Sequence, residues 1–180
     1  SYAGALTKNK VEADNFAKNV FNLLFIILLI FVLIAEIFMP QLIFLIAPGF
    51  YKDPEKLKLA VDLSRITFPF LFFVSLASFF GAILNSYNKF AAAAAAPIIL
   101  NVILIGSLFI SQWLDVSDVL TLSYAVSFAG FLQLLVLLFF VRKNFKPILT
   151  TKIRIDDKIK FFFRKLLPSI FSSGVTQINI

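Results

Sequence analysis

Long apolar stretches with few charged residues dominate the pattern of this 180-residue chain. Such stretches occupy residues of about 17–39, 66–88, 90–114 and 119–141, and a fifth begins at 166 and is cut off at 180. A helix needs about 20 mostly apolar residues to cross the hydrocarbon core of a bilayer, so the complete stretches are long enough. They are apolar on every face, whereas the strands of a membrane barrel alternate apolar and polar residues. We therefore predict an all-α fold, a polytopic transmembrane helix bundle with one transmembrane region over residues 1–180.

Polar residues, Gly and Pro mark the connections between these spans. Pro40 and the segment 47–50 (Ala-Pro-Gly-Phe) end the first span, and residues 50–64 are polar enough for an interfacial loop or a short helix. Residues 85–89 form a short turn. A second short turn covers 115–118, where Asp118 is placed to cap the next helix.

Lys and Arg are distributed unequally between the two sides that these spans define. The N-terminal segment, the turn at Lys89 and the connection over residues 142–165 lie on one side and hold 13 of them. The other side holds 4, all between residues 52 and 65. Because loops rich in Lys and Arg stay in the cytoplasm, we predict that the N-terminal side is the cytoplasmic one.

The composition narrows the possible chemistry. Hydrophobic residues make up 60% of the chain, and both Cys and His are absent, which removes thiolate and imidazole metal ligands and the usual general base. The net charge of +7 does not favour a nucleic-acid partner, because the 24 Phe residues lie inside apolar runs and are not interleaved with Lys and Arg. No catalytic motif is visible, so we expect no enzymatic activity, no metal and no cofactor.

The connection over residues 142–165 is predicted to be a cytoplasmic amphipathic segment. Ile159, Phe162 and Phe163 share one helical face, and Lys and Arg surround it. This pattern is typical of a helix lying at the membrane surface. It fits either a plain connector or a segment that recognises an anionic lipid or pyrophosphate.

Three ionisable residues lie in or beside the predicted spans, where such residues are functional candidates. We interpret Glu36 and Arg65 mainly as interfacial residues that reach toward water. Lys89 has two interpretations, a positively charged residue that fixes the orientation or a phosphate contact at the mouth of a cavity. We retain it as a candidate substrate-binding residue.

The fifth segment carries an unusually polar helical face. Its candidates for the wall of a substrate cavity are Ser172, Thr176, Gln177 and Asn179. Polar groups in lipid need partners, so the same face could instead form hydrogen bonds between helices. Both interpretations stay open. Because the chain begins with Ser and ends inside an apolar run, we expect it to be an inner portion of a longer protein.

Several short motifs occur in a characteristic order between residues 47 and 101. They are Ala47-Pro48-Gly49-Phe50, Arg65 to Pro69 (RITFP), Gly81 to Asn85 (GAILN), Asn88-Lys89-Phe90 and Ala96-Pro97 followed by Asn101. Together they resemble the MurJ/MviN family of lipid II flippases, within the wider group of multidrug, oligosaccharidyl-lipid and polysaccharide exporters. Leu167 to Ile170 resembles the start of that family's seventh helix.

The resemblance implies that the chain corresponds to about helices three to seven of roughly fourteen, a partial lobe of a flippase. It implies an undecaprenyl-pyrophosphate-linked peptidoglycan precursor (lipid II) as the substrate, alternating access as the mechanism, and the bacterial inner membrane as the location. The cavity arginines of the family's first, second and eighth helices lie outside this chain. Two alternatives remain: a related polysaccharide-lipid or multidrug exporter, and a non-transporting membrane scaffold or enzyme subunit.

Overall fold

The computed structural model describes residues 2, 9–149 and 164, and these residues contain helices and no strands. Two compact units are distinguished along the chain, one of residues 24–146 and one of residues 1–23 with 147–180. The second unit is described only in part, and helix α2 (Lys10–Ile37) begins in it. The unit of residues 24–146 holds the rest of α2 and the described helices that come after it.

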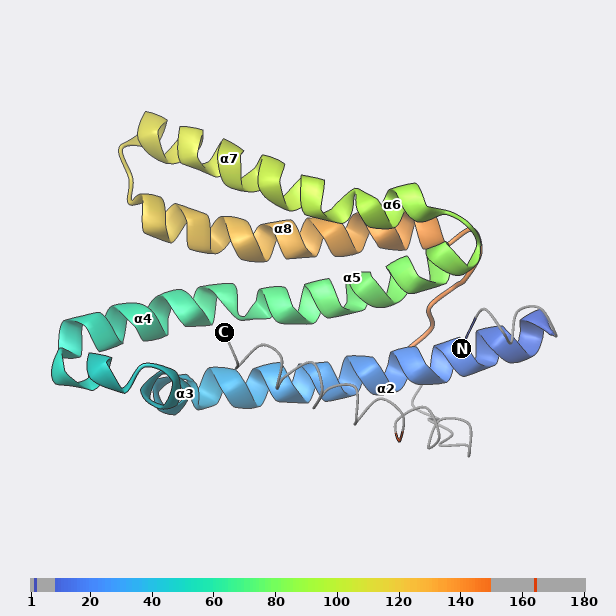
Figure 1. The fold of residues 1–180 in the computed structure, drawn as a ribbon, viewed down its shortest axis with the longest axis horizontal. Coiled ribbons are helices and arrows are strands. Elements are labelled where there is room, and N and C mark those ends of the chain that lie inside the picture. Colours follow the sequence, from blue (N-terminus) through green and yellow to red (C-terminus); the bar gives the residue numbers. More distant parts are fainter. Residues whose placement is uncertain (1, 3–8, 150–163, 165–180) are drawn as a thin grey trace. The chain divides into compact units, whose positions relative to one another are not determined.

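Three long helices form the centre of this larger unit. They are α5 (Pro69–Ser86), α7 (Ala96–Leu114) and α8 (Asp118–Val141), and α8 lies between the other two (Figure 1). α5 and α8 run in the same direction, and the chain returns between them through the short α6 (Phe90–Ala94) and α7 (Figure 1). This is the connectivity of a chain that crosses a membrane repeatedly.

Small residues allow α5 and α8 to approach closely. Gly130 of α8 lies against α5 so tightly that a Cβ atom there would come within 2.6 Å of Cδ2 of Phe70. Ala125 and Ala129 of α8 are buried as well, as are Ala77 and Gly81 of α5. Close packing of small residues is the usual way in which helices associate in lipid, where no hydrophobic force drives them together.

Two helices are interrupted at proline. α4 (Pro54–Thr67) ends before Phe68 and α5 begins at Pro69, and because Phe68 keeps helical dihedral angles the two helices form one long segment. There the hydroxyl of Ser127 in α8 donates to the backbone carbonyl of Ile66. The second interruption separates α6 from α7 at Ala95, two residues before Pro97. The span predicted over 90–114 is therefore present as α6 and α7 together, with a break at Ala95.

Aromatic contacts join the second half of α2 to the rest of this unit. Phe25 meets the edge of Phe72 with ring centroids 5.2 Å apart, and Phe31 lies 6.0 Å from Phe68.

After α2 the chain continues through α3 (Met39–Ile46) and the 3-10 helix η1 (Pro48–Lys52) into α4. The polar segment 50–64 is therefore mostly helical. Asp53 begins α4 by accepting a hydrogen bond from the backbone N–H of Lys56, and Pro54 takes the first helical position.

Four helical segments of the described chain are long and apolar enough to cross a membrane. They are Lys10–Ile37, Pro54–Ser86, Phe90–Leu114 and Asp118–Val141. Their outward faces carry large apolar side chains such as Phe109, Trp113 and Phe128, each more than half exposed. A continuous apolar surface of this kind is suited to lipid and not to water. The predicted all-α transmembrane bundle is confirmed.

Candidate functional site

The turn that carries Lys89 is built by a specific end to α5. Asn88 adopts a left-handed conformation with φ of 59°, which Asn tolerates better than most residues. The backbone N–H of Lys89 then bonds the carbonyl of Leu84, and that of Asn88 bonds the carbonyl of Asn85. This pair of hydrogen bonds is the Schellman motif, and it satisfies carbonyls that the helix end would otherwise leave open. The motif therefore fixes the backbone conformation at Lys89.

The Lys89 side chain is exposed and is held at its tip. Its Nζ donates to Oδ1 of Asn144, 2.7 Å away, although the two residues are 55 positions apart in the sequence. The next residue, Phe145, is 1% exposed and meets the edge of Phe79 in α5. The start of the 142–165 connection is therefore fastened to the Lys89 turn. Sequence reasoning identified Lys89 but missed Asn144, because nothing in the pattern links positions so far apart.

Further positive charge gathers beside this turn. Arg142, Lys143 and Lys146 are exposed, and the Arg142 guanidinium lies 4.1 Å from the centre of the Phe139 ring. No acidic residue occurs in the described segments 84–89 and 141–146 that form this end. A cluster of cations attached to an ordered turn can attract phosphate groups, each by charge-assisted hydrogen bonds.

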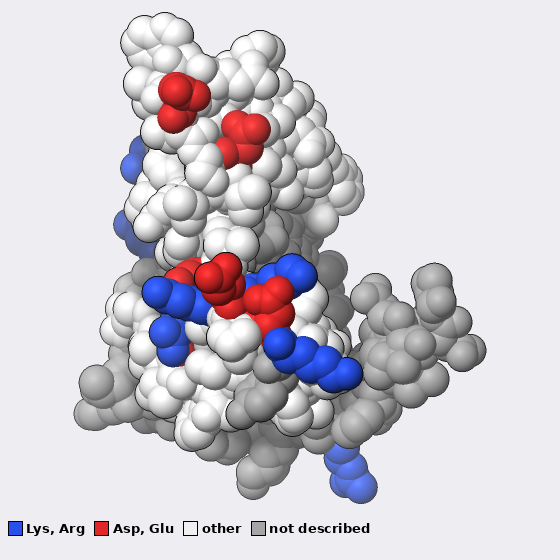
Figure 2. Space-filling model, turned by 90° about the vertical axis from the view of Figure 1, so that its left-hand side faces the viewer, with Lys and Arg blue, Asp and Glu red and all other residues white. Residues whose placement is uncertain are grey.

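The opposite end of the unit differs in charge. Figure 2 shows acidic side chains alone over the turn between α7 and α8, and a mixture of acidic and basic side chains over η1 and α4. The turn between α7 and α8 contains Asp115 and Asp118. The sequence predicted that Asp118 caps α8, and this is wrong. Ser117 precedes the helix, and the carboxylate of Asp118 instead accepts a hydrogen bond from the hydroxyl of Ser111, which is 1% exposed.

Glu36 and Arg65 lie together at this second end. The Nε of Arg65 donates to the backbone carbonyl of Glu36 at 3.3 Å, and Arg65 is exposed. This contact joins the last turn of α2 to α4. It gives Arg65 a structural role in addition to the interfacial one that the sequence indicated.

The remaining candidates belong to the C-terminal part of the chain. Ser172, Thr176, Gln177 and Asn179 lie outside the described residues, as does most of the predicted amphipathic segment. Among the residues that are described, no group of three or more Asp or Glu side chains could hold a metal ion.

Comparison with known proteins decides the family. The family model described as "Lipid II flippase MurJ" matches residues 1–180. The chain belongs to the lipid II flippase MurJ family. The resemblance seen in the sequence motifs is thereby confirmed, and the family is one of transporters and not of enzymes.

Curated relatives agree with this assignment. The chain is 41% identical to "Probable lipid II flippase MurJ" of Rickettsia prowazekii (strain Madrid E) over 96% of its own length and 34% of the relative. It is 36% identical to the protein of the same name from Rhizobium tropici over 99% of the chain and 34% of the relative. "Lipid II flippase MurJ" of Burkholderia cenocepacia is 32% identical over 77% of the chain. The chain thus spans about one third of the length of the first two relatives.

Proposed function

We propose that this chain forms part of one lobe of a flippase that moves lipid II from the cytoplasmic to the periplasmic face of the bacterial inner membrane. The observation that carries the proposal is the family match over the whole chain. A pyrophosphate headgroup cannot cross about 30 Å of hydrocarbon unaided, since a buried charge is costly there. A helix bundle that exposes a central cavity to one side and then to the other supplies the required path.

Lys89 is the described residue best suited to act on such a substrate. It lies on the side that the Lys and Arg count predicts to be cytoplasmic, and its neighbours are also cationic. The Schellman motif and Asn144 hold it in an ordered position at the end of α5. In this proposal Lys89 contacts the pyrophosphate as the headgroup enters, and Ser172, Thr176, Gln177 and Asn179 contribute to the cavity wall beyond it.

Complementation of a strain depleted of its own lipid II flippase tests the proposal. The intact protein should restore growth and should move labelled lipid II headgroups across the membrane. The Lys89→Glu variant should bind substrate about tenfold or more weakly, the effect expected for loss of a charge-assisted hydrogen bond and its replacement by repulsion. Lys89→Arg should retain function because it keeps the charge.

Lys143→Glu makes the same change of charge at another exposed residue of the same cationic cluster, so it separates a specific contact of Lys89 from the general attraction of the cluster. If Lys143→Glu impairs growth as much as Lys89→Glu at equal expression, the effect is one of orientation or surface charge and not of a specific contact. Normal growth of the Lys89→Glu strain would remove Lys89 from the mechanism. Failure of the intact protein to move lipid II would remove the proposed function.

A further inference from the structure

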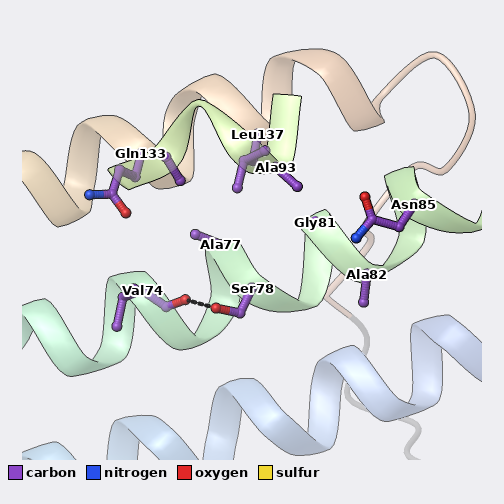
Figure 3. A pocket seen from close by; sticks show the side chains of 10 residues that line it. Val74, Ala77, Ser78, Gly81, Ala82, Asn85, Ala93, Gln133 and Leu137 are labelled. Atoms are coloured by element: carbon purple, nitrogen blue, oxygen red, sulfur yellow. Dashed lines mark hydrogen bonds between the residues drawn. The ribbon is translucent and has the colours of Figure 1, made fainter. Parts of the chain in front are cut away.

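A small recess of about 290 Å³, open on one side, lies between α5, α6, the start of α7 and α8 (Figure 3). We call it the Gln133 recess. The residues that line it are Val74, Ala77, Ser78, Gly81, Ala82, Asn85, Ala93, Ala96, Gln133 and Leu137. Most of these side chains are small, so backbone and methyl groups form the walls.

The interruption between α6 and α7 makes room for the recess. Pro97 has no N–H to donate to the carbonyl of Ala93, so the helix bends there. α6 nevertheless stays close to α5, because a Cβ atom on Gly81 would lie only 3.3 Å from the Cβ of Ala93. The close approach of Gly81 and Ala93 therefore closes one side of the recess, and Gln133 lies at another side.

Gln133 is the unusual residue of the recess. The residue as a whole is 3% exposed, but its amide is not among the fully enclosed unpartnered atoms of the described residues, so the amide keeps a small accessible area in the recess. Figure 3 shows its amide beneath α8, at the opposite end of the group of labelled residues from Asn85. An amide brings two donors and one acceptor, and burying them without partners is costly. Such groups in folded proteins are nearly always satisfied by protein or by ordered water.

The other polar groups of the recess are neutral. The Ser78 hydroxyl donates to the carbonyl of Val74 at 2.8 Å. Asn85 is exposed and lies in the last turn of α5, just before the Lys89 turn. No Lys, Arg, Asp or Glu is among the described residues that line the recess. The exposed lining residues Ser78, Ala82 and Asn85 show that this neutral recess opens along one side of α5, and Gln133 is its buried polar residue.

We propose that the Gln133 recess is a water site that is entered along the exposed side of α5 formed by Ser78, Ala82 and Asn85, with Gln133 as the group that holds the water. A polar cavity of this size has room for water, whereas a purely apolar one would stay dry. The recess thus brings water along one side of α5 into the interior of a bundle whose outer faces are apolar. The proposal does not depend on the substrate or on transport.

Residues 1–180 contain no Cys, so thiol labelling tests the proposal directly in membranes that contain the intact protein with any Cys outside these residues replaced. Ala77, 2% exposed, lines the recess, and Leu135, 42% exposed, faces outward from α8 two residues from Gln133. Methanethiosulfonates react with the thiolate, which forms in water and not in hydrocarbon. Methyl methanethiosulfonate should therefore modify Ala77→Cys about tenfold or more faster than Leu135→Cys.

Two further measurements bear on the role of Gln133. Adding Gln133→Leu should slow the labelling of Ala77→Cys to the rate of the Leu135→Cys control, because the group that holds the water is gone. A reagent that carries a sulfonate should react with Ala77→Cys more slowly than the neutral one. Equal rates at Ala77→Cys and Leu135→Cys, or a rate that Gln133→Leu leaves unchanged, would overturn the proposal.

Thermal unfolding provides a test that does not rely on labelling. If the recess were dry, the Gln133 amide would be unsatisfied, and Gln133→Met would raise the unfolding midpoint by removing it. If water occupies the recess, the midpoint should be unchanged or lower, because the substitution leaves that water with fewer partners. A clear rise in the midpoint would contradict the water site.

Discussion

The turn at Lys89 and the turn at Asp115 have the same backbone design and opposite charge. Each follows the end of a helix with a left-handed residue, Asn88 or Asp115, and each has a hydrogen bond from the next N–H back to a carbonyl five residues earlier. At one turn Lys89 reaches the amide of Asn144, and at the other Asp118 accepts from Ser111. The comparison teaches that backbone geometry closes the turns, while the side chains distinguish one end of the bundle from the other.

The largest effect should come from exchanging the charges of the two turns. Asp115→Lys and Asp118→Lys together with Lys89→Gln and Arg142→Gln reverse the local bias of basic residues that orients helices. We expect a substantial fraction of molecules to insert the α7–α8 hairpin wrongly. A single Cys at Val116, probed with an impermeant reagent from each side, measures this fraction.

The charge-preserving pair Lys89→Arg and Arg142→Lys serves as the control, and it should leave the labelling of a Cys at Val116 unchanged. Equal orientation of the exchanged variant and the parent would show that these four residues do not orient the hairpin.

A substitution in the middle of the bundle should weaken both ends alike. Gly130→Ala places a Cβ atom 2.6 Å from Cδ2 of Phe70 and 3.3 Å from the Cβ of Phe73, so the Phe70 ring must shift or α5 and α8 must move apart. We expect a loss of about 1–3 kcal/mol in the free energy of unfolding, as is typical of overpacking. Gly106→Ala is the control, because nothing lies within 4 Å of its added Cβ. An equal effect of the two substitutions would mean that α5 and α8 are not in close contact at Gly130.

The two side-chain ties should differ in strength. Ser111 is buried and its partner is a carboxylate, whereas Lys89 is exposed and its partner is only partly buried. A double-mutant cycle with Ser111→Ala and Asp118→Ala should give a coupling of about 1–2 kcal/mol. A cycle with Lys89→Ala and Asn144→Ala should give less than about 0.5 kcal/mol. A coupling between Lys89 and Asn144 that is larger than the coupling between Ser111 and Asp118 would contradict this prediction and would show that the Asn144 contact contributes strongly to stability.

The smallest expected effect is one of pH, and it should be confined to the acidic end. The ammonium and the backbone N–H of Lys56 hold the pKa of the Asp53 carboxyl below its usual value. Because the folded pKa is lowered, the capping contribution is present above the ordinary pKa and is lost as pH falls through the folded one. The protection of the amides in the first turn of α4, measured as their exchange rate relative to that of an unfolded chain at the same pH, should therefore fall below about pH 4.

The Asp53→Asn variant should lack this pH dependence, and the described residues 84–89, which contain no acidic side chain, should not show it either. Parallel changes at both turns would indicate that the whole bundle loosens and that Asp53 is not the cause.

The sequence was informative where one local rule was sufficient. Length and hydropathy predicted the helical class, because crossing lipid imposes a minimum on any helix. Local signals failed where the partner is distant. Asp is a residue type that often caps helices, yet the carboxylate of Asp118 accepts a hydrogen bond from Ser111 on the preceding helix. The contact of Lys89 with Asn144 likewise depends on which segments become neighbours. The break before Pro97, in contrast, has a local cause in the missing N–H of proline. Nothing in the sequence pattern indicated the position of Gln133, because the residues around it come from three other helical segments.

Phe145 connects the chain that follows α8 to α5. Its ring is almost wholly buried and lies against Phe79, four residues beyond the last helical residue of α8. The contact of this ring with Phe79 therefore ties the first residues after α8 to α5. Unwinding of the last turn of α8 would have to break an aromatic contact with a second helix.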